Sequence, residues 1–211
     1  MRSININHSS KHFAQEYGFT LIEILISSAI LVILAFGFLG LQYIIGRNQV
    51  SVWKSYLSIE DANQAISAMS RELRSARQND AGEYLLETAN DNEIIFYSDS
   101  DYDEAVERVR YTLTDNKLIK GTIEPVGSPA VYPLESEKVR IVSEIIRNGT
   151  NPTFYYYNSN WPEDTTNNPL QQDSRISDTA EVKIVVRTNP DNSNPKYDYT
   201  LESNVRLRMI F

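Results

Sequence analysis

The apolar and polar positions divide the chain into three stretches with different periods. Residues 24–46 carry no charged side chain, and as a helix rising about 1.5 Å per residue this run crosses a hydrocarbon core of about 30 Å. After Gly46, apolar residues recur at intervals of three and four, with charged residues such as Arg71 and Glu72 between them. This spacing predicts a helix with an apolar face and a water-exposed face. From Tyr84 onward the period falls to two, which predicts strands.

We expect one long helix from about Thr20 to Gln78. Its first half lies in lipid, and its second half packs on a head domain. The apolar face of the second half consists of Val52, Tyr56, Ile59, Ala62, Ile66, Met69, Leu73 and Ala76. The helix end is predicted at residues 79–82, Asn-Asp-Ala-Gly, because turn-forming residues followed by glycine are typical just beyond a helix.

The remaining chain predicts an antiparallel β domain. Strands are expected at residues 93–97, 109–113, 118–120, 139–146, 154–157, 182–187 and 199–209. Residues 115–117, Asp-Asn-Lys, form the turn of a hairpin between the second and third of these strands. The predicted fold class is therefore α+β, with a long N-terminal helix packed on an antiparallel β-sheet head.

The start of the apolar run carries the most specific motif of the chain. Residues 18–25 read Gly-Phe-Thr-Leu-Ile-Glu-Ile-Leu, so that one carboxylate, Glu23, precedes the uncharged run. A carboxylate at the edge of a membrane segment needs a cationic or hydrogen-bonding partner. Residues 1–18 are polar and come before the apolar run, whereas a secretory signal peptide has its apolar region before the cleavage site. The apolar segment is therefore expected to remain in the mature protein.

This motif resembles the processing site of the type IV pilin-like superfamily, in which a hydrophilic leader ends at glycine and the mature chain begins with phenylalanine. The resemblance implies that a prepilin peptidase cuts between Gly18 and Phe19 and methylates the new N-terminus at Phe19. It also implies that Glu23 forms an assembly salt bridge with the freed amine, on the same or a neighbouring subunit. A second interpretation stays open, because Thr20 and Glu23 have the Thr-x-x-Glu spacing of a capping box, and capping alone explains a glutamate here.

Gly37 and Gly40 lie in the middle of the apolar run. Because glycine in a helix interior costs about 1 kcal/mol relative to alanine, we expect this pair to form a soft spot at which the helix can unwind locally. Close approach of a neighbouring helix is the alternative, although the better-attested small-residue motif has three residues between its glycines.

Residues 99–104 place carboxylates at alternate positions, Asp99, Asp101 and Asp103, which is how a calcium-binding loop begins. The sixth position is Glu104 where an EF-hand has glycine, and the twelfth is Arg110 where it has glutamate, which excludes an EF-hand. We expect a solvated acidic loop, with calcium bound at the three aspartates as the alternative. No other cofactor is expected.

Composition argues against an enzyme and against a nucleic-acid partner. The chain has no cysteine, and both of its histidines, His8 and His12, lie in the predicted leader. The processed chain would lack the commonest nucleophiles, general bases and zinc ligands, so we expect no catalytic residues. The net charge of −8 disfavours a partner held by phosphate contacts.

Short segments of the soluble part resemble two kinds of minor subunit. Residues 69–76, 96–99 and 108–111 are similar to the J-type minor pseudopilin of type II secretion systems and to W-type minor pilins. The resemblance implies a structural subunit of a type II secretion pseudopilus or a type IV pilus, assembled through its N-terminal helix. The alternative is a membrane-tethered binding module whose head captures an exported protein, a surface or DNA.

The predicted organisation has four parts. They are a leader at residues 1–18, a transmembrane half-helix at 19–46, an amphipathic half-helix at 47–78 and a β-rich extracytoplasmic head at 79–211. The protein is expected to cross the cytoplasmic membrane once, with its N-terminus cytoplasmic, and then to enter a cell-envelope filament. Expected partners are the prepilin peptidase, other pilins or pseudopilins, the inner-membrane assembly platform and the lipid bilayer.

Overall fold

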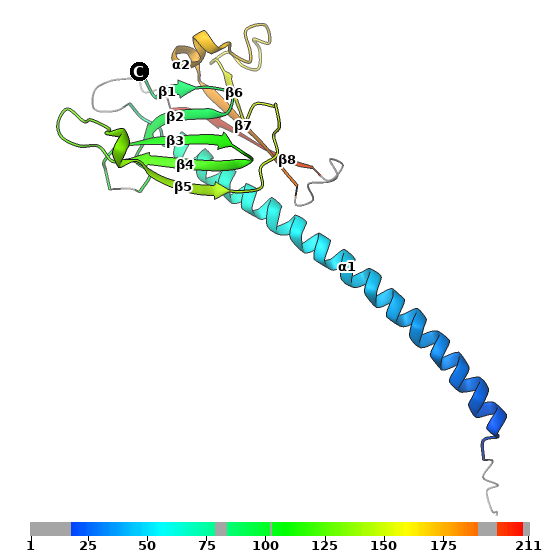
Figure 1. The fold of residues 1–211 in the computed structure, drawn as a ribbon. Coiled ribbons are helices and arrows are strands. Elements are labelled where there is room, and N and C mark those ends of the chain that lie inside the picture. The colour runs from blue at the N-terminus through cyan, green and yellow to red at the C-terminus, as the bar shows by residue number, and fades with distance from the viewer. Residues whose placement is uncertain (1–17, 79–83, 102, 190–197, 209–211) are drawn as a thin grey trace, which may run out of the picture. The chain divides into compact units, whose positions relative to one another are not determined.

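The computed structural model describes residues 18–78, 84–101, 103–189 and 198–208 (Figure 1). Contacts within the chain fall into two units, Met1–Val50 and Ser51–Phe211. The second unit is called the head unit below, and it contains the last turns of the long helix together with all the strands.

Helix α1 (Leu21–Arg74) contains the whole apolar run. Its segment Leu21–Arg47 is long and apolar enough to cross a membrane. All side chains of this segment are exposed in the described structure, including Leu31 at 68 % and Phe36 at 72 %. Such a surface is unfavourable in water, so these side chains need lipid or other protein around them.

Eight strands of the described chain form two antiparallel sheets (Figure 1). The larger sheet follows chain order through β1 (Leu86–Ala89), β2 (Glu93–Ser98), β3 (Glu107–Thr114), β4 (Lys117–Ile123) and β5 (Lys138–Ser143). The smaller sheet has the order β6 (Phe154–Tyr157), β7 (Glu181–Thr188), β8 (Tyr199–Arg206). Three short helices lie between strands: η1 (Leu134–Ser136), η2 (Gln172–Ser174) and α2 (Arg175–Asp178).

The predicted α+β class, with a long N-terminal helix and an antiparallel head, is confirmed. The predicted hairpin is formed by β3 and β4, in which Thr114 pairs with Lys117. The two turn residues, Asp115 and Asn116, have φ angles of 51° and 63°. Two successive residues with positive φ are typical of a type I′ turn, whose twist suits a two-residue hairpin. Strand β1 and the division into two sheets are additional to the prediction.

The helix ends at Arg74, so the predicted end at Gln78 is wrong. The hydroxyl of Ser75 donates to the carbonyl of Glu72 at 2.9 Å, and Ala76 pairs with Ser98 at the end of β2 in an isolated bridge. These contacts take the chain out of the helix before its apolar pattern ends. The predicted stop signal at residues 79–82 lies outside the described residues.

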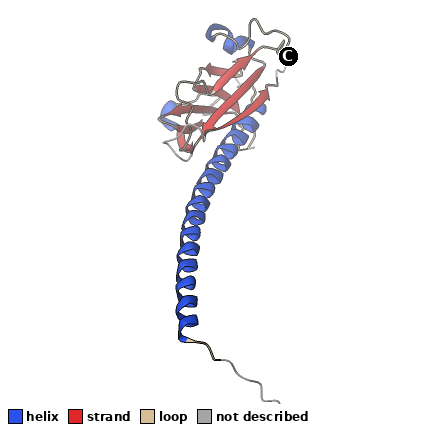
Figure 2. Ribbon diagram, turned by 90° about the vertical axis from the view of Figure 1, so that its right-hand side faces the viewer, coloured by secondary structure: helices blue, strands red, loops and turns tan. Residues whose placement is uncertain are grey.

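One hydrophobic core joins the last turns of α1 to both sheets. Figure 2 shows the end of this helix lying against the strands. The helix contributes Ala62, Ala65, Ile66, Met69 and Leu73, all buried. The largest fully buried side chains of the strands are Phe96, Tyr111, Phe154 and Tyr156. The helix also contacts the smaller sheet directly, because Ser70 Oγ donates to Ser203 Oγ of β8 at 2.8 Å. The head unit therefore folds around a helix that belongs to its core.

The charged position Glu72 faces the core and not solvent, contrary to its place in the apolar–polar pattern. Lys120 of β4 donates to Glu72 Oε1 at 2.8 Å, and the hydroxyl of Tyr111 of β3 donates to Glu72 Oε2 at 2.9 Å. The Glu72 and Lys120 side chains are only 10 % and 8 % exposed. Both carboxylate oxygens thus have a donor, which is the condition under which a buried charge is tolerated.

Replacing Glu72 with alanine should lower the free energy of unfolding by about 3–5 kcal/mol, because it leaves the Lys120 ammonium buried without its counter-charge. Glu60→Ala is the matched control, since Glu60 is an exposed residue of the same helix, and it should change stability by less than about 0.5 kcal/mol. Urea denaturation of a fragment starting at Ser51, followed by circular dichroism, measures both. Equal stabilities of the two variants would contradict this role for the ion pair.

A second ion pair links β3 to the segment before β5. Arg110 donates to both carboxylate oxygens of Glu137, with Nε to Oε1 and Nη2 to Oε2 both at 2.8 Å. The hydrogen bond from Arg110 lowers the pKa of Glu137 below its usual value. This carboxylate lies against Gly121 of β4, where an added Cβ would overlap it. Glycine is therefore needed at this position for the carboxylate to reach Arg110.

The lowered pKa of Glu137 means that the pair stabilises the fold at neutral pH, and that this contribution is lost as the pH falls from about 5 through the lowered folded-state pKa. Gly121→Ala displaces the carboxylate, so its stability should fall less steeply between about pH 5 and pH 3 than that of the wild type. Glu135→Gln, an exposed neighbour, should keep the wild-type slope. Thermal melts across this pH range measure the slopes, and a parallel profile for Gly121→Ala would refute the assignment.

Candidate functional site

The N-terminal motif folds as a capped helix start. Glu23 Oε2 accepts hydrogen bonds from the backbone N–H and from the hydroxyl of Thr20, both at 2.8 Å. In return, the Glu23 backbone N–H donates to Thr20 Oγ1 at 3.4 Å. This reciprocal arrangement is a capping box, which satisfies backbone N–H groups that have no partner within the helix. Thr20 and Glu23 thus have the geometry that the capping interpretation requires.

Capping leaves part of the Glu23 carboxylate unused. Both hydrogen bonds from Thr20 reach Oε2, and within the described residues Oε1 accepts none. Gly18 and Phe19 precede the helix, and Phe19 is 84 % exposed. An added Cβ at Gly18 would meet no atom of the described residues within 4 Å, apart from those of its chain neighbours. The bond between Gly18 and Phe19 is therefore accessible, a few residues from a carboxylate that retains a free oxygen.

Gly37 and Gly40 lie inside α1, which continues through both without interruption. An added Cβ at either glycine would meet nothing within 4 Å, so no contact with the described residues requires glycine there. The proposed soft spot stays a prediction.

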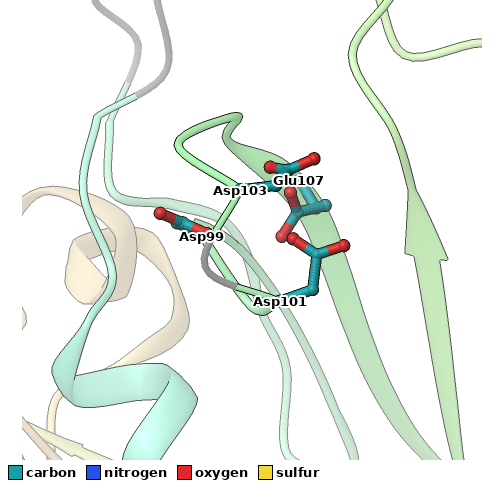
Figure 3. A group of neighbouring side chains, drawn as sticks. All are labelled: Asp99, Asp101, Asp103 and Glu107. Carbon is teal, nitrogen blue, oxygen red and sulfur yellow. The ribbon is translucent and has the colours of Figure 1, made fainter.

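The acidic loop between β2 and β3 brings its predicted residues together. One carboxylate oxygen from each of Asp99, Asp101, Asp103 and Glu107 lies within 4.8 Å of the others (Figure 3). Glu107 is the first residue of β3 and was not among the predicted ligands. The calcium-loop pattern in the sequence includes only the loop residues. The antiparallel pairing of Ser98 with Glu107 then brings Glu107 beside the start of the loop.

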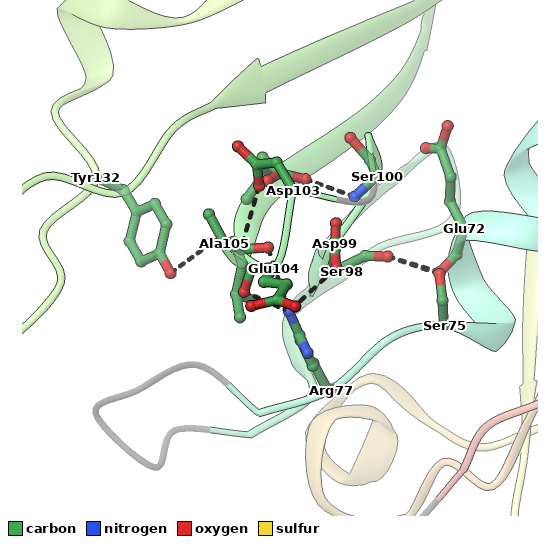
Figure 4. A network of polar contacts seen from close by, with 12 residues as sticks. Glu72, Ser75, Arg77, Ser98, Asp99, Ser100, Asp103, Glu104, Ala105 and Tyr132 are labelled. Atoms are coloured by element: carbon green, nitrogen blue, oxygen red, sulfur yellow. Dashed lines mark hydrogen bonds and ion pairs between the residues drawn. The ribbon is translucent and has the colours of Figure 1, made fainter.

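The loop is also held by Arg77, which follows α1 (Figure 4). Its Nη2 donates to the carbonyls of Glu104 and Ala105 at 3.0 and 3.2 Å, and it lies 3.5 Å from Asp99 Oδ2. Asp103 Oδ1 accepts the backbone N–H of Ala105 at 2.9 Å. The guanidinium therefore positions the loop backbone and makes a salt bridge with one of the four carboxylates.

Glu107 is fully buried, with 0 % exposure. Its Oε2 accepts the backbone N–H of Ser100 at 2.5 Å, whereas Oε1 is buried and has no hydrogen-bond partner among the described residues. Burial raises the pKa of this carboxyl above its usual value, although the hydrogen bond from Ser100 opposes the rise. Asp99 likewise has a buried oxygen, Oδ1, to which no described residue donates a hydrogen bond.

A hollow of about 810 Å³ opens on another part of the head unit. It is lined by Tyr84, Leu86, Glu87, Tyr97, Arg108, Ala130, Val131, Tyr132, Leu134 and Ile176. Several of the apolar residues at its edge are exposed, with Tyr84 at 62 % and Leu134 at 68 %. Glu87 and Arg108 form a salt bridge at 2.6 Å within it. The mixture of apolar and paired polar groups suits contact with another protein surface.

Comparison with known proteins assigns a motif to the first unit. Residues 14–39 match the prokaryotic N-terminal methylation motif, and this match covers Gly18, Phe19 and Glu23 but none of the head unit. No curated protein matches the chain. The prepilin-type motif and the membrane-length helix that follows it support a type IV pilin-like protein that is anchored in a membrane.

Proposed function

We propose that this chain is a minor pilin or pseudopilin, a structural subunit of a type II secretion pseudopilus or of a type IV pilus. The observation that carries the proposal is the position of Glu23, an exposed carboxylate with an unused oxygen, at the start of an uncharged helix and within the residues that match the methylation motif. The chain is then a substrate of the prepilin peptidase and not itself a catalyst.

Cleavage between Gly18 and Phe19 would create an amine on Phe19, four residues before Glu23. In lipid, an unpaired ammonium and an unpaired carboxylate are both costly, and pairing them removes both costs at once. An arriving subunit is thereby drawn to the position at which its charge meets the opposite charge of a neighbour. The exposed apolar side chains of Leu21–Arg47 provide the surface for lipid before assembly and for neighbouring helices afterwards.

The head unit supplies the contacts that distinguish one subunit from another. The J-type and W-type resemblances of residues 69–76 and 96–99 support a minor subunit, with the head exposed on the outer side of the cytoplasmic membrane. The hollow edged by Tyr84 and Leu134 is a suitable surface for a neighbouring head. The same hollow also favours the second candidate function, a membrane-tethered module that binds an exported protein.

Native protein should begin at Phe19 and carry a methyl group on its terminal nitrogen, because the peptidase removes residues 1–18 and methylates the product. Intact-mass measurement of protein from its own cells checks this. Gly18→Val should remain full length, since a branched side chain replaces the glycine at the cut. Gly37→Ala, a glycine change within the helix, should be processed normally. A Met1 start in all native material would overturn the proposal.

Glu23→Ala should be processed and inserted normally but recovered in filaments at least about tenfold less than wild type, because the pairing charge is lost. Glu23→Gln tests the role of the charge separately from that of capping, because glutamine is uncharged but also completes a capping box. We expect this variant to assemble as poorly as Glu23→Ala. Sheared-filament fractions, compared with membrane fractions by immunoblotting, measure the ratio.

The glutamine variant also decides between the alternatives. Normal assembly of Glu23→Gln together with poor assembly of Glu23→Ala would make capping the role of this residue. A tethered binding module needs only its anchor, so full function of both variants without any filament would favour the second candidate.

A further inference from the structure

The four clustered carboxylates of the head unit have a geometry that suits one ion. Asp99 follows β2, Asp101 and Asp103 lie in the loop, and Glu107 begins β3, so the ligands come from both strands and from the loop between them. Two oxygens bound to one calcium ion, each at about 2.4 Å, are at most about 4.8 Å apart. The four oxygens already lie within 4.8 Å of one another.

Two buried oxygens of this cluster have no partner among the described residues. Glu107 Oε1 and Asp99 Oδ1 are both inaccessible to solvent and accept no hydrogen bond from the part of the chain that the structure describes. A buried carboxylate oxygen without a donor is unfavourable, and buried charges in proteins are normally paired or bound to metal. The side chain of Glu107 is 0 % exposed, and its carboxylate lies in the cluster beside those of the three aspartates (Figure 3).

The described residues supply too little positive charge to balance the cluster. Among the described residues, the salt bridge to these four carboxylates is that of Arg77 with Asp99, at 3.5 Å. The same guanidinium is committed to the carbonyls of Glu104 and Ala105. Like charges held this close repel one another, and a cation among them would remove the repulsion.

We propose that the carboxylates of Asp99, Asp101, Asp103 and Glu107 bind a calcium ion. An all-oxygen set selects a hard cation, and it offers none of the nitrogen or sulfur ligands that zinc or copper prefer. Calcium accepts six to eight ligands in an irregular arrangement, so that water can complete the shell beside the exposed Asp101 and Asp103. Magnesium requires near-ideal octahedral geometry at about 2.1 Å and is the poorer fit for a loop of this kind.

Bound calcium would tie the end of β2 to the start of β3. It would also fix the loop backbone that Arg77 contacts just after α1. The site therefore links the sheet edge to the segment that leaves the core helix. The inference concerns the head unit alone and goes beyond the proposed function, because it holds whether or not the chain enters a filament.

Isothermal titration of full-length protein in detergent, stripped of metal with a chelator, with calcium chloride tests the proposal. We expect one calcium per chain with a Kd of about 10⁻⁴–10⁻³ M, as in extracellular calcium modules, because two ligands are exposed. At about ten times the Kd, calcium should raise the Tm of the head by about 3–6 °C. Magnesium chloride at the same concentration should have a much smaller effect.

Asp101→Asn and Glu107→Gln should each weaken calcium binding by about tenfold or more, because each removes one ligand charge. Asp173→Asn is the matched control, since Asp173 is an exposed aspartate of η2, outside the cluster, and its affinity should equal that of the wild type. Asp101 is exposed, so its variant keeps the test decisive if Glu107→Gln does not fold.

Two results would overturn the proposal. One is the lack of saturable calcium binding by wild-type protein up to about 10 mM, a concentration well above the affinities of extracellular modules. The other is unchanged affinity of folded Asp101→Asn. Neither result bears on cleavage at Gly18, so failure here is distinguishable from failure of the proposed function.

Discussion

The salt bridge between Glu72 and Lys120 joins α1 to β4 at a point where neither charge is well exposed to water. Around it, Met69 and Leu73 of the helix and Tyr111 of β3 are fully buried. Apolar burial supplies most of the favourable free energy of such a core, while the charged pair restricts which helical face can enter it. A rotation of the helix that removed Glu72 from Lys120 and Tyr111 would leave buried charges without partners. The position of the sheet on the helix is therefore fixed by the paired charges as well as by apolar packing.

The apolar side chains of the two units have different surroundings. In the head unit, the helix face from Ala62 to Leu73 is covered by strands of the same chain. In the first unit, the side chains of Leu21–Arg47 have no cover from the described part of the chain. The single helix α1 thus supplies a core element to one unit and an uncovered apolar surface to the other. The residues that match the methylation motif, 14–39, all belong to the first unit, whose apolar side chains are exposed.

Local patterns were sufficient to predict most of the elements. The change of period near Tyr84 separated helix from strands, and the Asp115-Asn116 turn placed the β3–β4 hairpin. Strand β1 (Leu-Glu-Thr-Ala) has only four residues and no run of β-branched or aromatic side chains, whereas the equally short β6 (Phe-Tyr-Tyr-Tyr) consists of aromatic residues, which favour strands. The helix end was missed because Ala76 pairs with Ser98, a tertiary contact that has no local signal.

Burial of charged residues was less predictable, because it also depends on contacts between residues that are distant in the sequence. Glu72 looks like a solvent-exposed position of an amphipathic helix, and its partner Lys120 lies 48 residues further along the chain. The aspartates of the acidic loop were visible as a sequence pattern, but Glu107 joins them only through the pairing of β2 with β3. The capping box at Thr20 and Glu23 needed no distant contact, and the sequence motif was sufficient to predict it.

The inclusion of the last turns of α1 in the core limits where a protease can release an intact head from its anchor. A cut before Ala62 would leave every helical side chain of the core attached to the strands. A cut between Met69 and Leu73 would instead open the core and separate the two residues from each other. Release of a folded head unit is thus confined to cuts in the helix before Ala62, because later cuts would disrupt the core.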